Sequence, residues 1–178
     1  MAACVLALSN VAAFAQTLVY SSGNNNPKLT TPIYGPGLPV PPKWAACAFR
    51  PTHSGPLEHV EVGLGWQQGF NGIVLSVVEG DVKGPTMGPM HVLDTMMQLQ
   101  IPPDSVLPMY NKVASVNHPV ISAGKMYWLV MSPVGLDTYV FWHMADLKSN
   151  NHCLASFDGG QTWTYPQNPQ ELFTVYIK

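Results

Sequence analysis

Apolar and polar residues alternate along much of this chain with a period of two, the pattern of β-strands that bury one face. The clearest example lies within residues 57–67, where every second position from 60 to 66 is apolar, while Glu61, Gly63 and Gly65 occupy the positions between. The apolar positions are Val60, Val62, Leu64 and Trp66. We therefore predict a strand here, with its apolar side in a core.

A second apolar run, residues 73–79, follows a turn signal at residues 69–72. This arrangement is typical of a β-hairpin, so we predict that the two runs pair with each other. Further strand-like runs bounded by proline or glycine cover residues 17–21, 44–49, 90–101, 112–116, 125–131, 138–144, 152–157, 162–165 and 171–177. No stretch is predicted to be helical. The pattern predicts an all-β fold, an antiparallel β-sandwich of jelly-roll or lectin-like type with about nine or ten strands.

Residues 1–15 have the pattern of a secretory signal peptide. An apolar run from Cys4 to Phe14 ends in Ala13-Phe14-Ala15, an A-x-A cleavage site, although the first basic residue is Lys28. The alternative is a short buried helix or strand. The run is shorter than the roughly 20 residues that span a bilayer, so we expect no membrane span in the mature chain. The signal peptide predicts a secreted protein, extracellular or periplasmic.

The rest of the chain divides into two segments. Residues 16–42 hold a first strand and a proline-rich arm, and residues 43–178 form the predicted sandwich domain. Six prolines between Pro27 and Pro42 favour an extended backbone and exclude a central strand.

Composition limits the classes of partner. Charged residues make up 10% of the chain, the formal net charge is −2, and Arg50 is the only arginine. Nucleic acid and anionic membranes are therefore not expected partners, and a site built on an arginine cluster is excluded. Solubility must depend on uncharged polar side chains, which suits a neutral polar partner such as a glycan or packing against another protein.

Two cysteines remain if Cys4 leaves with the signal peptide. In an exported domain, Cys47 and Cys153 predict one disulfide. It would close a loop of about 105 residues and stabilise the fold by roughly 4–5 kcal/mol in the chain-entropy model. The alternative is a pair of buried free thiols.

Several motifs follow one another in an order that resembles the secreted β-sandwich domains of bacterial surface proteins with PEP-CTERM-type or choice-of-anchor sorting tails. The motifs are residues 44–51, Gly65-Trp66, residues 121–130, residues 156–163 and residues 173–175. The resemblance covers roughly residues 43–178 and implies an exported sandwich without implying an activity. The Val-Pro-Glu-Pro motif and C-terminal apolar span of that family are not found before Lys178, which would imply a released member.

Residues 156–163 match the Asp-box pattern S-x-D-x-G-x-T-W. In sialidases and related propellers this motif is a hairpin turn, in which the aspartate accepts hydrogen bonds from turn amides and the tryptophan packs beneath. We expect the same structural role for Asp158. Calcium binding by Asp158 is the alternative, and no other cofactor is expected.

No catalytic constellation is recognisable. The six histidines form no H-x-H or H-E-x-x-H pattern, and no G-x-S-x-G motif is present. Glu58 and Glu61 are three residues apart, so in a strand they should face opposite sides and not form a glycosidase pair. We therefore expect no enzyme and keep a secreted hydrolase as the third hypothesis.

Five tryptophans are many for a small domain. We assign Trp66 and Trp128 to the core. Other aromatic residues near turns, together with amides, resemble the groups that bind sugars on β-sandwiches, and they would equally suit a protein interface. The predicted ligand-binding patch is Tyr139, Trp142, Asn151, Asp158 and Trp163. The first hypothesis is thus a non-catalytic module that binds a glycan or another extracellular polymer, and the second is a structural subunit that assembles with itself by strand addition.

Overall fold

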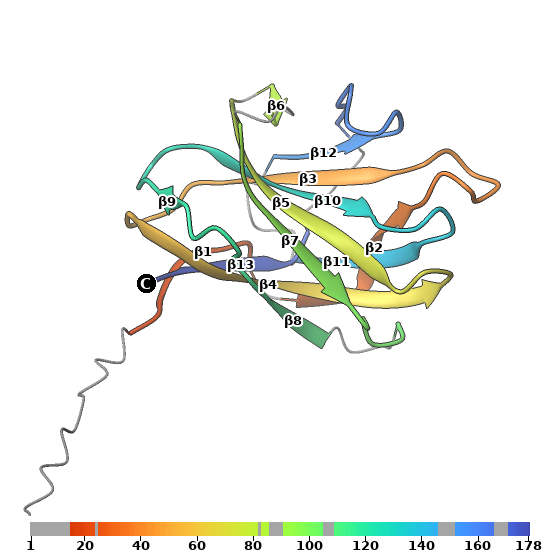
Figure 1. Cartoon of the computed structure of the whole chain (residues 1–178), viewed down its shortest axis with the longest axis horizontal. Coiled ribbons are helices and arrows are strands. Elements are labelled where there is room, and N and C mark those ends of the chain that lie inside the picture. The colour runs from red at the N-terminus through yellow and green to blue at the C-terminus, as the bar shows by residue number, and fades with distance from the viewer. Residues whose placement is uncertain are drawn as a thin grey trace, which may run out of the picture.

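The computed structural model of the chain is a two-layer β-sandwich (Figure 1). It describes residues 15–23, 25–81, 83–85, 91–104, 109–145, 152–165 and 171–178. The predicted signal peptide, apart from Ala15, lies outside these residues. Within them the chain forms thirteen strands rather than nine or ten, and every pair of named strands is antiparallel. The prediction of an all-β antiparallel sandwich is confirmed.

We call the seven-stranded layer sheet I. Its order is β1-β13-β4-β11-β2, with β8 and β9 also paired to β4. The central strand β4 is the longest at 14 residues, and it pairs with β13 along its first half and with β11 along its second. The strands are β1 (Thr17–Ser21), β2 (Asn25–Tyr34), β4 (Gly55–Gln68), β8 (Met109–Ala114), β9 (Val120–Ile121), β11 (Tyr139–Ala145) and β13 (Phe173–Ile177).

We call the six-stranded layer sheet II. Its order is β12-β3-β10-β5-β6, and β7 pairs with β5. The strands are β3 (Trp44–Phe49), β5 (Gly72–Asp81), β6 (Gly84–Pro85), β7 (Val92–Leu99), β10 (Tyr127–Pro133) and β12 (Cys153–Ser156). No helix among the described residues is long and apolar enough to cross a bilayer.

The predicted hairpin between residues 57–67 and 73–79 is wrong. These runs are β4 and β5, and they lie in different sheets. The turn signal specifies a reversal of the chain but not the sheet that the next strand joins. Strand β5 is buried along most of its length, so it needs neighbours on both sides, and it finds them in β7 and β10.

The two sheets face each other across the main core. The inward residues of β4 are Val60, Val62 and Leu64, each at most 1% exposed, which confirms the predicted alternation. Trp66 is only half-buried against this core, and its indole N–H donates to the carbonyl of Gly69. The predicted core role of Trp66 is therefore met only in part.

A second, smaller core covers the outer face of sheet II. Trp128 is completely buried there, as predicted, and its indole N–H donates to the carbonyl of Asp81. The half-buried rings of Trp44 and Trp163 pack against the cluster. Its buried members are Ala46, Ala48, Val78, Trp128, Val130 and Leu154. Sheet II is thus covered on both faces around Trp128, whereas Met97 and Leu99 of β7 remain exposed.

The proline-rich segment belongs to the sandwich. Strand β2 is an edge strand of sheet I, paired only with β11, where a residue such as Pro32 is tolerated. Strand β1 forms the opposite edge, paired with β13. The segment expected as an N-terminal strand and arm thus contributes two strands to sheet I.

Three turns that cross between the sheets pack together at one end of the sandwich. They are residues 35–43, 69–71 and 134–138, which join β2 to β3, β4 to β5 and β10 to β11. The Gly35 N–H donates to the carbonyl of Thr138 at 2.8 Å, and the Phe70 N–H donates to the Asp137 carboxylate at 3.0 Å. Gly69 has φ +73° and no room for a Cβ beside Asp137, so this turn requires glycine.

Candidate functional site

The predicted patch is divided between the two sheets. Tyr139 lies on the outer face of sheet I, whereas Asp158 and Trp163 lie in a turn that packs on sheet II. Trp142 is 0% exposed between the sheets, and its indole N–H donates to the carbonyl of Leu172. Its assignment as a ligand-binding residue is therefore wrong, because the strand alternation that exposes Tyr139 and Phe141 turns Trp142 inward. Asn151 lies outside the described residues.

Asp158 organises the Asp-box turn, as predicted. Its Oδ1 accepts from the backbone N–H groups of Gln161 and Thr162, and its two oxygens also accept from the hydroxyls of Ser156 and Thr162. These hydrogen bonds, led by the Thr162 hydroxyl, lower the pKa of Asp158 to about 2. Gly159 and Gly160 have φ +74° and +87°, so both require the glycine that the motif supplies. Calcium binding at Asp158 stays a prediction.

A row of aromatic rings crosses the outer face of sheet I at β2 and β11. The ring centroids of Tyr34 and Tyr139 are 4.8 Å apart, and those of Tyr139 and Phe141 are 5.0 Å apart. All three rings are only partly buried. Desolvation, Tyr34 and Asp104 raise the pKa of Tyr139 to about 12, so its phenol is neutral and can donate a hydrogen bond.

Next to this row, Asp104 and His143 lie over the backbone of β4. The Asp104 N–H donates to the carbonyl of Trp66, and the Asp104 carboxylate is 3.3 Å from Nε2 of His143. A Cβ at Gly65 would overlap Asp104, and one at Gly63 would come within 3.3 Å of the His143 Cβ. Burial lowers the pKa of His143, which favours a neutral imidazole. The alternating glycines of β4 were the sequence signal for this arrangement, because their missing side chains leave the space that Asp104, His143 and Leu172 fill.

The other half of the same face is polar. Glu61 accepts hydrogen bonds from the hydroxyls of Thr174 and Tyr176, each at 3.3 Å. The His59 ring stacks on Tyr176 and contacts the carboxylates of both Glu58 and Glu61. The expectation that these two glutamates face opposite sides of the strand is thus wrong. A register shift of β4 against β13 at this point breaks the alternation, so that Leu57 and Val60 both lie in the core.

We call the whole surface the sheet I face. Asp104, Glu61 and several aromatic rings bring acceptors and apolar ring faces together on it, and Tyr110 is 49% exposed. Sequence analysis identified one of its members as a ligand-binding residue, Tyr139. The face consists of Tyr34, Glu61, Asp104, Tyr110, Tyr139, Phe141, Thr174 and Tyr176.

A pocket of about 400 Å³ lies beside two of the crossing turns, residues 35–43 and 134–138. Asp158 lines it, but its oxygens already accept hydrogen bonds within their own turn. The other lining residues are Pro36, Pro42, Trp44, Pro133, Val134, Gly135, Leu136 and Gly159. With apolar walls and an occupied carboxylate, the pocket offers few groups that would recognise a polar ligand.

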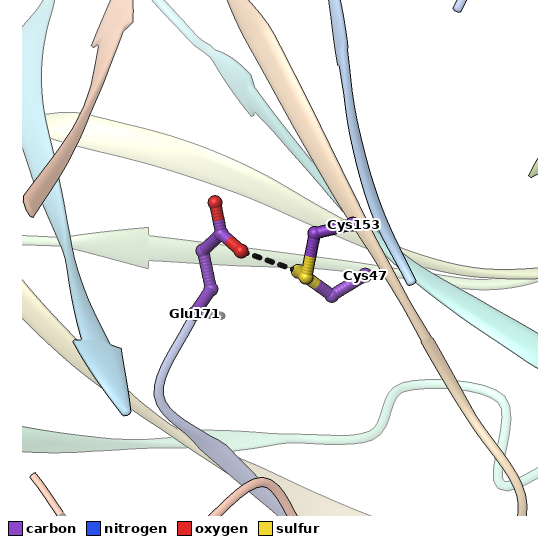
Figure 2. Close-up of side chains that lie close together, drawn as sticks. All are labelled: Cys47, Cys153 and Glu171. Atoms are coloured by element: carbon purple, nitrogen blue, oxygen red, sulfur yellow. Dashed lines mark hydrogen bonds between the residues drawn. A yellow bond between two sulfur atoms is a disulfide. The ribbon is translucent and has the colours of Figure 1, made fainter. Parts of the chain in front are cut away.

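Inside the sandwich, the predicted disulfide is confirmed. Cys47 of β3 and Cys153 of β12 are directly opposite each other, with a Cα–Cα distance of 4.1 Å. Figure 2 shows the Glu171 carboxyl group directed at this disulfide, with one oxygen 2.7 Å from Cys47 Sγ. These three are the one set of side chains in the described residues close enough to share a metal ion. With the sulfurs joined to each other, no thiolate is available as a ligand. Glu171 was not among the residues predicted to form a site.

Comparison with known proteins gives no relative. No family model matches the sequence, and no curated protein matches it significantly. The function must therefore be argued from the geometry of the chain itself.

Proposed function

We propose that this protein is an exported, non-catalytic module that binds a neutral polysaccharide with the sheet I face. One observation carries the proposal: the partly exposed rings of Tyr34, Tyr139 and Phe141 form a row beside the carboxylate of Asp104. Sugars present apolar C–H faces and hydroxyl edges, so they are recognised by aromatic rings together with hydrogen-bonding groups. The sheet I face supplies both.

The polar half of the face extends this argument. Tyr110 offers a hydroxyl, and the hydroxyls of Thr174 and Tyr176, which donate to Glu61, can accept hydrogen bonds from a ligand. Their strands pair with β4. The low formal charge of −2 disfavours strongly charged ligands and leaves a neutral glycan as the fitting class.

The state of the acidic groups favours binding over catalysis. Glu61 is held by Thr174 and Tyr176, and Asp104 lies against His143. Carboxylates engaged in this way are suited to fixing neighbouring side chains rather than to donating protons to a glycosidic bond. The buried disulfide agrees with an extracellular or periplasmic location.

Self-assembly by strand addition has weaker support at the edges of sheet I. At β1, the Val19 carbonyl already accepts the N–H and the hydroxyl of Thr52. At β2, Pro32 has no N–H to offer to an added strand. The native mass of the mature protein, measured by light scattering after gel filtration, tests this alternative directly, because a polydisperse assembly would favour it.

The binding proposal is tested with soluble neutral polysaccharides, by retardation in affinity gels and then by titration calorimetry. We expect retardation by at least one of them. Tyr139→Ala and Tyr34→Ala should each weaken binding about tenfold or more, because each removes a central ring of the face.

The matched control is Tyr165→Ala, which removes a tyrosine that is 64% exposed on the Asp-box hairpin. It should bind like the parent protein. Failure of every neutral polysaccharide to bind would overturn the proposal. Equal loss in the control would show that the sheet I face is not the site.

A further inference from the structure

The closest contact of the buried carboxyl group of Glu171 is with sulfur. Glu171 is 1% exposed, and its partners Cys47 and Cys153 are 0% and 2% exposed. Its Oε2 lies 2.7 Å from Cys47 Sγ, while its Oε1 accepts a hydrogen bond of 2.9 Å from the Thr31 hydroxyl. The carboxyl group therefore joins β2 of sheet I to the disulfide of sheet II through the core (Figure 2).

The hydrogen-bond donors around Glu171 indicate which of its carboxyl oxygens can carry a proton. A disulfide sulfur carries no hydrogen and can only accept, and the Thr31 hydroxyl already donates to Oε1. A hydrogen bond between Oε2 and the disulfide sulfur Cys47 Sγ is therefore possible only when Oε2 carries a proton. An ionised Glu171 would instead set a negative oxygen against sulfur lone pairs in a buried site.

The surroundings of Glu171 agree with a neutral acid. Burial raises the pKa of Glu171 to about 7, and Lys43 is the charged group that opposes this shift. The neighbouring strand β11 contacts the segment that carries Glu171 through its backbone, because the Leu172 N–H donates to the carbonyl of His143. The His143 ring itself lies beside Asp104. Among the described residues, the other titratable groups in contact with this carboxyl are the two cysteines, once they are reduced.

We propose that the Cys47–Cys153 disulfide and Glu171 form a proton-coupled redox site that reacts with dithiols. In the oxidised state the neutral carboxyl donates to Cys47 Sγ. In the reduced state the Cys47 thiol has a hydrogen of its own and donates it to the Glu171 carboxylate.

The exchange balances as follows. A dithiol transfers two electrons and two hydrogens to the S–S bond, which breaks to give two thiols, while the dithiol closes to its own disulfide. Glu171 releases its proton to solvent and becomes the acceptor of the Cys47 S–H. At pH values where Glu171 is protonated in the oxidised state and ionised in the reduced state, the protein therefore releases one proton for each disulfide reduced.

The fold provides a route to the buried sulfurs. Strand β12 has four residues and is the edge strand of sheet II, so lifting it from β3 uncovers Cys153 without separating the two sheets. Because β12 leads directly into the Asp-box turn, reduction would also release that turn from its covalent link to β3.

The test is the thiol–disulfide equilibrium of the mature protein with reduced and oxidised dithiothreitol, from about pH 5 to about pH 8. Samples are quenched with acid, alkylated and counted by mass spectrometry. We expect the equilibrium constant for reduction to rise about tenfold or more across this range, because the oxidised state alone is penalised when Glu171 ionises. In Glu171→Gln the constant should stay within about twofold.

Glu79→Gln is the matched control, because Glu79 pairs with Lys125 at the surface of sheet II. It should keep the parent profile, and identical profiles for the parent and Glu171→Gln would overturn the proposal. If Glu171→Gln does not fold, redox-difference infrared spectroscopy of the parent at mildly acidic pH replaces it. Reduction should remove the C=O band of a protonated carboxyl, and a redox-independent band would refute the coupling. Neither measurement depends on polysaccharide binding.

Discussion

On the outer side of sheet II, Trp128 is fully buried in a cluster to which Trp44 and Trp163 add their rings, whereas on the outer side of sheet I the rings of Tyr34 and Tyr139 stay partly exposed. Both outer faces carry aromatic residues, which come from β2 and β11 on sheet I and from β3, β10 and the Asp-box hairpin on sheet II. One set is closed over by β6 and the Asp-box hairpin and contributes to stability. The other set remains partly exposed.

The difference follows from the groups between the rings. The sheet II cluster is apolar throughout, so covering it removes surface from water at no electrostatic cost. The sheet I face carries Glu61, Asp104 and tyrosine hydroxyls, which burial under another element would desolvate. A polar, aromatic face left open in this way is suited to a ligand that brings its own hydroxyls.

Loss of the disulfide should lower the free energy of unfolding more than any other change, because it removes the link between β3 and β12 of sheet II. Replacing Cys47 and Cys153 together by alanine removes a link across 106 residues, and we expect unfolding to become easier by about 4–5 kcal/mol. Urea unfolding at neutral pH measures this change. A loss below about 1 kcal/mol would mean that apolar packing alone holds β12 in place.

Trp128→Ala should cost about 3–5 kcal/mol, because it empties the centre of the covered cluster. Tyr139→Ala on the open face should cost less than about 1 kcal/mol, since its ring is already partly in water. Parallel urea titrations of the two variants compare the faces directly. Equal losses would mean that the sheet I face is structural.

The core between the faces should give the stability a pH dependence. The pKa of Glu171 rises from 4.5 to about 7 on folding, so the folded state holds this proton more tightly. The resulting stabilisation is complete below about pH 4.5 and is lost as the pH rises through about 7, a decline of about 3 kcal/mol.

Urea unfolding of the parent and of Glu171→Gln across this range isolates the contribution. Burial lowers the pKa of His143, which acts in the opposite direction below its ordinary value of 6.5 but is common to both proteins. A difference between the two proteins that does not change with pH would contradict a neutral Glu171.

Tyr139→Phe should have the smallest effect, within about 0.5 kcal/mol, because the ring and its neighbours remain. Alkaline titration of tyrosine absorbance should show one fewer group ionising near pH 12 than in the parent. An unchanged titration would assign that late phenol to another tyrosine. The variant also separates the hydroxyl of the open face from its ring in any binding assay.

Local patterns predicted the strands and the disulfide but not the pairing of distant segments. The alternation in residues 57–67 predicted strand β4 and its inward face. The presence of two cysteines in a domain expected to be exported predicted the disulfide. The error at residues 69–72 arose because a reversal of the chain looks the same whether it stays in one sheet or crosses to the other. The crossing depends on packing with residues 35–43 and 134–138, far away in sequence.

The candidate site was less predictable for a similar reason. Alternation along β11 predicts that Trp142 faces the opposite side from Tyr139 and Phe141. It does not predict which of the two sides is the core, because all three residues are aromatic. Asp104 reaches the sheet I face through a bridge between distant backbone groups, and Glu171 meets the disulfide only after three strands assemble. The local sequence does not predict such contacts between distant residues. The only local signal is the pair Gly63 and Gly65, whose missing side chains make room for His143 and Asp104.

The pairing of β1 with β13 determines how the domain responds to mechanical force. Thr17 at the start of β1 lies opposite Ile177 at the end of β13, so a pull on the two chain ends acts on the same end of the ladder. The backbone hydrogen bonds then break one pair at a time instead of sharing the load. Extension would next be limited by the Cys47–Cys153 link, which keeps the chain between those residues from being drawn out. Under such a force, sheet I would thus unfold first, at low force, and the disulfide would then stop further extension.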